Sequence, residues 1–500
     1  MSSPDTSPTG KHNFVIVIPV ADRPRQLADC LDSLALLCRT FDAGKGMVRV
    51  LIADDSVEPG NIDDHRALAL HYSQLGIPVA HFGPDEQFEL AASAGNSLSR
   101  IVGTPTRQGH KGQGVARNLA YLKLAREGLP DDTLIWSIDS DQEFRVKIST
   151  PEGDQDVFSV NFFRRLDDIF TQTDALVLTG KVVGDPPVSP AVMAGNFLED
   201  VIGFLQQASG NDGSDPCRHH ETGAQGGIDP AYHDMADLFG FKPAAAPFRY
   251  RCTLSGDHTD ADCLDHFTSR LSGFFYGEHP TRVTYYRGGD GDSGAPQPAR
   301  TVYAGNYVFR PDALKYFIPF STLRLRMSGP TLGRIIRSEI GDRFVSANLP
   351  MLHKRTARDM GRSEFRPGVA ESDAAIDISN EFERQFYGDI MLFSVERGVL
   401  RRPEMLDDVR AEMLTRYNDR RASLAGKLAR LDALIDAHGG PHASRARLRI
   451  FRDNIERNFG PASPALARIN AEDHWQRWRA DLLDAIRHYP EDRQAWDSTI

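Results

Sequence analysis

Short apolar runs alternate with helix-like segments through the N-terminal part of the chain, and this alternation constrains the fold most strongly. Uninterrupted runs rich in Val and Ile are typical of strands covered on both faces. Such runs begin at Phe14 (FVIVI), Val48 (VRVLIA), Pro78 (PVAHF), Thr133 (TLIWSI) and Asp174 (DALVLTG). Leucines at helical spacing lie between them. The pattern predicts an α/β protein with a mostly parallel sheet and right-handed crossovers.

Length and composition exclude several classes of protein. A chain of 500 residues exceeds the usual size of one domain, so we expect a large first domain and a further region. The longest apolar runs are far shorter than the about 18 residues of a membrane-spanning helix. A net charge of −11 argues against nucleic-acid binding, but leaves room for a local basic pocket. Five scattered cysteines and the lack of a signal segment favour a reduced, cytoplasmic protein.

The texture of the sequence changes twice. Residues 210–304 are rich in Gly, Asp and Pro, which predicts a long, loop-rich insertion. Residues 369–500 carry Leu and Trp stripes typical of amphipathic helices. We therefore expect a disordered tail (1–12), one α/β domain (13–368) with halves at 13–180 and 181–368, and a C-terminal helical region. Three roles stay open for those helices: covering the second half, mediating oligomerisation, or docking a partner.

The strongest local signal is Asp139-Ser140-Asp141, directly after the run TLIWSI. Ligands of open α/β sheets bind beyond the carboxyl ends of the strands. Two carboxylates one residue apart suit Mg²⁺ or Mn²⁺ together with substrate phosphates. The alternative is a helix cap or a solvated turn.

Two further motifs flank this signal. Asp54 and Asp55 end the second run, where a carboxylate can accept hydrogen bonds from a base or a ribose, or simply cap a turn. The segment HKGQGVARN contains Lys111 and two glycines before a predicted helix, whose N-terminus suits a phosphate. Arg117 lies one turn into that helix. The segment fails as a dinucleotide fingerprint, because it has two glycines rather than three.

Taken together, these segments resemble the nucleotide-binding half of a GT-A-fold glycosyltransferase, most like the family-2 type. The order and spacing match over about residues 13–180, in the segments FVIVIPVADRPRQLADCLDSL, VLIADDS, GQGVARNLAYLKLA and LIWSIDSDQEF. The resemblance implies a Rossmann-like sheet flanked by helices. It also implies an enzyme that moves a sugar from a UDP- or GDP-linked donor to a hydroxyl of a small or glycan acceptor.

The resemblance also assigns roles to individual residues. Pro19, Ala21 and Arg23 would approach the nucleotide, and Asp54, Asp55 or both would contact its base or ribose. Arg117 would support the donor pocket, beside the cation that Lys111 offers. The Mn²⁺ or Mg²⁺ ion would be held by Asp139, Asp141 and, in the acceptor half, His353. The neighbouring Lys354 and Arg355 would neutralise the departing diphosphate.

One position departs from the family pattern. Inverting family-2 enzymes carry a carboxylate before the last catalytic-domain helix as general base, but the matching stretch 326–331 (RMSGPT) contains no acid. Either the base comes from elsewhere or the reaction is retaining, and the stereochemistry stays open. The candidates for a base are Glu199, Asp200, Asp234 and Glu278.

Other interpretations remain beside this one. A sugar nucleotidyltransferase usually has a glycine-rich loop after the first strand, and PVADRPRQL has no glycine. A non-catalytic nucleotide- or carbohydrate-binding protein could use the same fold, and peripheral membrane association stays open. In the insertion, Cys217 with His219 and Cys263 with His266 could form halves of a zinc site, although the spacing is not a recognised one and acceptor contacts explain the histidines equally well.

Overall fold

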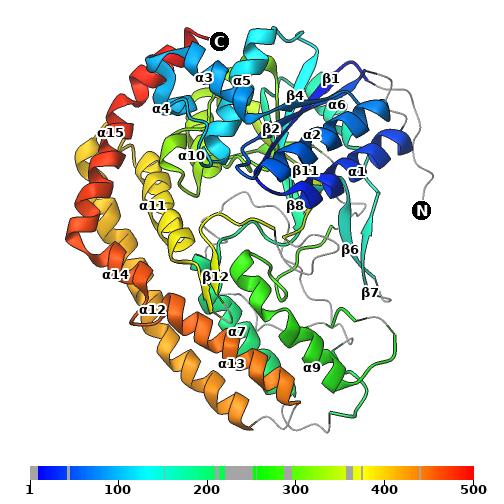
Figure 1. Ribbon diagram of the computed structural model, residues 1–500, viewed down its shortest axis with the longest axis vertical. Helices are drawn as coiled ribbons and strands as arrows, with labels where there is room; N and C mark the ends of the chain where they lie inside the picture. The colour runs from blue at the N-terminus through cyan, green and yellow to red at the C-terminus, as the bar shows by residue number, and fades with distance from the viewer. Residues whose placement is uncertain are drawn as a thin grey trace.

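The computed structural model is shown in Figure 1. It describes residues 10–41, 46–150, 153–208, 213–219, 250, 252–254, 256–286, 295–355, 364–372, 375–437 and 441–500.

A mixed, mostly parallel sheet forms the centre of the first domain. Its order is β3-β2-β1-β4-β10-β8-β11-β5, with β9 paired to β11. The strands are β1 (Asn13–Val20), β2 (Val48–Asp54), β3 (Val79–Phe82), β4 (Thr133–Ile138), β5 (Gln142–Glu143), β8 (Val177–Gly184), β9 (Gln297–Pro298), β10 (Asn306–Phe309) and β11 (Phe344–His353). β10 runs antiparallel between β4 and β8, whereas β11 runs parallel to β8. The carboxyl ends of β1, β2, β4, β8 and β11 therefore meet at one edge.

Helices cover both faces of this sheet, as the continuous apolar strands predict. Phe14, Ile16 and Ile18 of β1 face one hydrophobic core, and Val15 and Val17 face another. The helices of this domain are α1 (Pro24–Thr40), α2 (Pro59–Gln74), α3 (Pro84–Ala94), α4 (Ser99–Val102), α5 (Gln113–Glu127), α6 (Phe162–Gln172) and α10 (Ser328–Ile340). A hairpin of β6 (Val146–Thr150) and β7 (Gly153–Val157) projects from the sheet (Figure 1).

A third core joins the second half of the domain to the C-terminal helices. It unites α7 (Pro190–Ala208) and α9 (Asp260–Ser269) with α11–α15. Those helices are α11 (Ser379–Glu396), α12 (Leu406–Ala437), α13 (His442–Phe459), α14 (Pro464–Asn470) and α15 (Glu472–Asp497), preceded by the strand pair β12 (Ala370–Ser372) and β13 (Ala375–Asp377). The stripe Leu424, Leu428 and Leu431 is buried in this core, so it packs within the chain. Figure 1 shows α15 returning to the sheet domain beside α3 and α4.

The insertion contains a helix that the Gly- and Pro-rich texture did not predict. Thr259 begins α9 with a capping box, in which its side chain and that of Asp262 bind each other's backbone N–H groups. This motif stabilises short helices in otherwise irregular chain.

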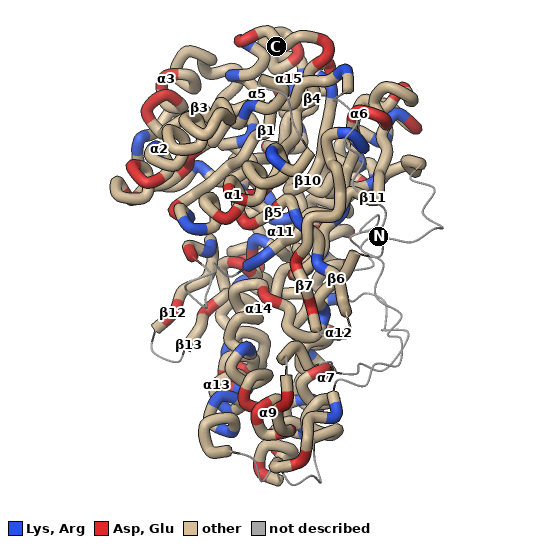
Figure 2. Tube along the Cα trace, turned by 90° about the vertical axis from the view of Figure 1, so that its right-hand side faces the viewer, with Lys and Arg blue, Asp and Glu red and all other residues tan. Residues whose placement is uncertain are grey.

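Charged residues are spread over the whole molecule. Figure 2 shows basic and acidic residues interspersed along both the sheet domain and the helical part. Within the described residues, no helix has the length and apolar character needed to cross a membrane.

Candidate functional site

Asp141 and His353 come together at the carboxyl edge of the sheet because of one short strand, β5. β5 follows Asp141 and pairs antiparallel with the end of β11, with His353 opposite Gln142. The backbone N–H of Lys354 also donates to the carbonyl oxygen of Asp141, at 2.9 Å. This register places Asp141 beside His353, although the two residues are far apart in the sequence.

Asp141 and His353 form a buried pair with two unsatisfied atoms. Oδ1 of Asp141 lies 3.6 Å from Nε2 of His353, and neither atom has a hydrogen-bond partner among the described residues. Nδ1 of His353 donates to the carbonyl oxygen of Asp185, so Nε2 of the neutral ring carries a lone pair. Two lone pairs that face each other at this distance suit a cation between them, with the backbone carbonyl orienting the imidazole.

The second oxygen of Asp141 faces arginines. Arg355 lies 2.7 Å and Arg23 3.5 Å from Oδ2. Burial raises the pKa of Asp141, but the positive charges beside it, Arg355 first and also Arg23, hold it well below its usual range. Asp141 is therefore an ionised carboxylate inside the protein.

Asp139 lies at the more open side of the same turn. Its side chain is 20% exposed and accepts hydrogen bonds from Arg117 and Gln113 of α5. Arg117 is buried and also donates to the hydroxyl of Ser137, at 3.1 Å. A Cβ on Gly305 would lie 2.6 Å from Oδ2 of Asp139, so this position admits only glycine without a shift of the carboxylate.

A further buried arginine, Arg366, lies near Arg355, which contacts the Asp141 carboxylate. Arg366 is 8% exposed, and its Nη2 has no hydrogen-bond partner within the described part of the chain. Burial and the charges of Arg355 and Arg326 lower the pKa of Arg366 well below its usual range. Gly277, at φ +97°, passes so close that an added Cβ would lie 3.1 Å from Arg366 and 3.3 Å from Arg355. Crowded, desolvated guanidinium groups of this kind are stabilised by a polyanion.

The other predicted basic residues lie in different settings. Lys354 pairs with Glu143 at 3.1 Å and with Asp156 of β7 at 3.0 Å, so its ammonium group is directed toward the hairpin. Lys111 pairs with Asp55 at 3.1 Å, and that carboxylate also accepts the N–H groups of Lys111 and Gly112.

Asp54 is held entirely by protein groups. It is 0% exposed, and Oδ2 lies 2.8 Å from His81 Nε2 and 3.1 Å from His65 Nδ1. Burial raises the pKa of Asp54, but hydrogen bonds from the two histidines outweigh that effect and lower it below its usual range. Of the two adjacent aspartates, Asp54 ties the end of β2 to α2 and β3.

The loop after β1 is tied down by a residue that the sequence patterns did not single out. Pro19 is buried within β1, and Ala21 is half-buried at the start of the loop. Asp22, at φ +51°, accepts hydrogen bonds from the backbone N–H groups of Val57 and Glu58. The sequence offers one signal for this role, because Asp tolerates the left-handed region better than most residues.

The four candidates for a general base lie in different surroundings. Glu199 lies on α7 and pairs with Lys427 and Arg430 of α12, 3.4 and 3.3 Å away. Asp200 is 1% exposed and forms a bidentate pair with Arg282, with both contacts at 2.8 Å. Burial raises the pKa of Asp200 to about 6, although Arg282 lowers it. Asp234 lies outside the described residues.

Glu278 is linked to the Asp141–His353 pair through Asp185. Its neighbour His279 donates its backbone N–H to Asp185 Oδ1 at 3.0 Å, and Asp185 also orients His353. Burial, followed by the charge of Asp185, raises the pKa of Glu278 to about 7. A half-buried carboxyl that titrates near neutrality is suited to proton transfer.

Comparison with known proteins gives matches in structure alone. Neither a protein-family model nor a curated protein sequence matches the chain. Among solved structures, the mannosyltransferase PcManGT from Pyrobaculum calidifontis, in complex with GDP-Man and Mn²⁺, is 10% identical, with 97% of this chain and 88% of that chain covered and a TM-score of 0.36. TarS from S. aureus is 12% identical, with 90% of this chain and 54% of that chain covered and a TM-score of 0.30. Mouse xyloside xylosyltransferase 1 is 12% identical, with 39% of this chain and 56% of that chain covered and a TM-score of 0.22.

The chain aligns with the first two of these structures over most of its length. It also has the mixed, mostly parallel sheet, flanking helices and C-terminal helical region expected from the sequence. At these TM-scores, an assignment of function depends on the site rather than on the likeness.

Proposed function

We propose that the protein is a metal-dependent glycosyltransferase that moves a sugar from a UDP- or GDP-linked donor to an acceptor hydroxyl. The observation that carries this proposal is the pair of facing lone pairs on Asp141 and His353, set among buried arginines at the carboxyl edge of the sheet. A divalent cation and a diphosphate together satisfy both halves of that arrangement.

Asp141 and His353 would hold the ion, with Asp139 as the more exposed carboxylate of the same turn. Bound there, Mn²⁺ or Mg²⁺ would supply charge neutralisation for the departing diphosphate. Arg355, Arg366 and Arg23 would add fixed positive charge where the leaving group becomes more negative. Because these guanidinium groups are already desolvated and positioned, little reorganisation accompanies the reaction.

Glu278 would act as the general base. The acceptor oxygen attacks the anomeric carbon, the bond from that carbon to the diphosphate oxygen breaks, and the hydroxyl proton passes to Glu278. Its raised pKa, about 7, supports this role.

The layout of the chain follows from this site. We assign 13–180 to donor binding, 181–368 to acceptor binding, and 369–500 to support of the acceptor half through the shared core. The five cysteines are free thiols, which is in keeping with a reducing, cytoplasmic compartment.

A panel of sugar nucleotides, with and without Mn²⁺, tests the proposal. We expect UDP or GDP to raise the melting temperature only when the metal is present, and the matching sugar nucleotide to be slowly hydrolysed. Asp141→Asn and His353→Gln should both lose the metal-dependent shift. Asp85→Asn, at a carboxylate whose side chain is 83% exposed, serves as the control. Metal-independent binding, or unchanged turnover in His353→Gln, would contradict the metal site. Retained nucleotide sugar without turnover would instead favour a binding protein.

A further inference from the structure

A cluster of three cysteines lies in the insertion, apart from the Asp141–His353 site. The sulfur atoms of Cys217, Cys252 and Cys263 all lie within 4.8 Å of one another. All three are free thiols, and Cys252 and Cys263 are buried, at 2% and 0% exposure. Tetrahedral zinc with bonds of about 2.3 Å to thiolates brings sulfur atoms into this range of separations.

A histidine contacts one member of the cluster, Cys252. Nε2 of His258 lies 3.2 Å from Sγ of Cys252, and Nδ1 donates to the carbonyl oxygen of Gly256 at 2.8 Å. A zinc-binding imidazole is held in this way, because the second nitrogen is anchored on a backbone carbonyl and the first presents its lone pair to the metal.

The backbone around the cluster is organised to bring these side chains together. The N–H of Cys217 donates to the carbonyl of His258, and the N–H of Cys252 donates to that of His219, both at 3.0 Å. An isolated bridge also pairs Pro216 with Thr259, which begins α9. Cys263 then lies in the first turn of α9. The tertiary structure thus brings Cys217, from the turn at 213–219, next to the residues around the start of α9.

Neither apolar packing nor a disulfide accounts for the whole cluster. Buried thiols can pack as small apolar groups, and Phe204 and Phe267 contact each other in the same core, with ring centroids 4.2 Å apart. Apolar packing gives no reason for an imidazole nitrogen directed at a thiol. A disulfide would use two sulfur atoms and leave the third and the histidine without a role.

We propose that Cys217, Cys252, Cys263 and His258 bind a structural Zn²⁺ ion that ties Cys217 and Cys252 to the start of α9. The sequence offered two possible half-sites, Cys217 with His219 and Cys263 with His266. Each contains one cysteine of the proposed set, but neither contains His258. The ion adds to the hydrophobic packing around α9, since metal binding to a folded site is itself folding free energy.

Metal analysis of the full-length protein, purified under reducing conditions without chelators, tests the proposal. We expect about one zinc per chain, the stoichiometry of a closed four-ligand site. Cys217→Ser, Cys252→Ser, Cys263→Ser and His258→Gln should each lower the zinc content several-fold. Cys38→Ser, at a half-buried thiol of α1, and His266→Gln should retain it. Loss of zinc in His266→Gln together with retention in His258→Gln would overturn the assigned ligand set.

Two further measurements keep the test decisive if a serine variant fails to fold. His258→Cys should restore the zinc that His258→Gln loses, because a Cys₄ site is equally suitable. In the wild-type protein, a mercurial that titrates thiols should release zinc in step with modification. The proposal would be overturned if protein purified from cells grown with added zinc contained no zinc. A disulfide between any two of the three cysteines would also overturn it. Asp141→Asn should keep its zinc, so the failure of either metal site can be told apart from the failure of the other.

Discussion

At the scale of single residues, the orientation of His353 depends on one backbone oxygen. Asp185 accepts the Nδ1 proton of His353 and, through its carboxylate, the backbone N–H groups of Arg355 and His279 at 3.2 and 3.0 Å. The lone pair on Nε2 is therefore a product of the turn after β8. A His at position 353 without that turn would be free to present either nitrogen.

The raised pKa of Glu278 makes a prediction about pH dependence. Because the carboxyl titrates near pH 7, it is largely protonated below that pH and cannot accept a proton. We expect kcat/KM for glycosyl transfer to rise as the pH increases through about 7. Glu278→Gln should lower kcat by roughly 10²- to 10⁴-fold, with metal-dependent nucleotide binding retained.

Glu199→Gln is the matched control, because that carboxylate pairs with Lys427 and Arg430 on α12 and lies outside the proposed reaction path. Equal losses in both variants, or an ascending pH limb that survives in Glu278→Gln, would reject Glu278 as the base.

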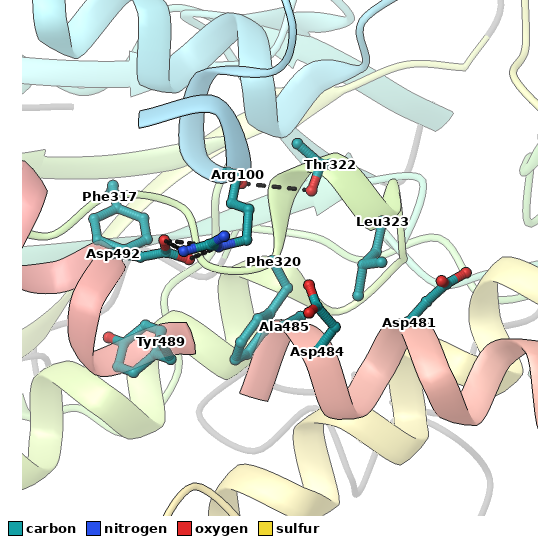
Figure 3. A pocket seen from close by; sticks show the side chains of 10 residues that line it. All are labelled: Arg100, Phe317, Phe320, Thr322, Leu323, Asp481, Asp484, Ala485, Tyr489 and Asp492. Atoms are coloured by element: carbon teal, nitrogen blue, oxygen red, sulfur yellow. Dashed lines mark hydrogen bonds and ion pairs between the residues drawn. The ribbon is translucent and has the colours of Figure 1, made fainter. Parts of the chain in front are cut away.

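At the scale of elements, the last helix anchors the C-terminal region to the sheet domain. Figure 3 shows Arg100 of α4 meeting Asp492 of α15 in a pocket lined by Phe317, Phe320 and Tyr489. Trp496 follows one turn later. It is 0% exposed and donates from its indole to the carbonyl of Leu314 at 2.8 Å.

Trp496→Ala should therefore lower the free energy of unfolding by about 3 to 5 kcal/mol, as measured by urea denaturation. Burial of the indole stabilises the helix far more than the neighbouring ion pair does. Since the Arg100 side chain is 39% exposed, Asp492→Asn should cost about 1 kcal/mol or less. Similar losses in both variants would show that the ion pair anchors α15 as strongly as the indole does.

At the scale of the whole molecule, the C-terminal helices and the acceptor half share one core. Phe197 and Leu198 of α7 are buried at 1% and 0% exposure in the cluster that also contains Phe451 of α13. The rings of Phe197 and Phe451 lie 5.4 Å apart, edge to face. An acceptor half without these helices would expose a large apolar surface.

We therefore expect a chain truncated after residue 368 to aggregate rather than to fold. Size-exclusion chromatography and near-ultraviolet circular dichroism compare it with the full chain. Removal of only 1–9 should leave both readouts unchanged. A monomeric, cooperatively unfolding 10–368 chain would show that the shared core is dispensable.

The sequence by itself determined the sheet domain, its strand ends and the candidates gathered there. Apolar runs and helical spacing are local patterns, and parallel strands necessarily bring their carboxyl ends to one edge. Asp139, Asp141 and Arg117 were therefore predictable as a group, whereas Arg355 was placed with them only by the resemblance to GT-A-fold glycosyltransferases.

Only the tertiary structure decided which of those side chains face one another. The Asp141–His353 pair depends on the register of β5 against β11, and the cysteine cluster depends on a bridge between 216 and 259. Arg366 and the setting of Glu278 had no local signal, because desolvation and the charges of distant neighbours produce their shifted pKa values. Those quantities arise from contacts between segments far apart in the chain, and no periodicity or motif within one segment encodes them.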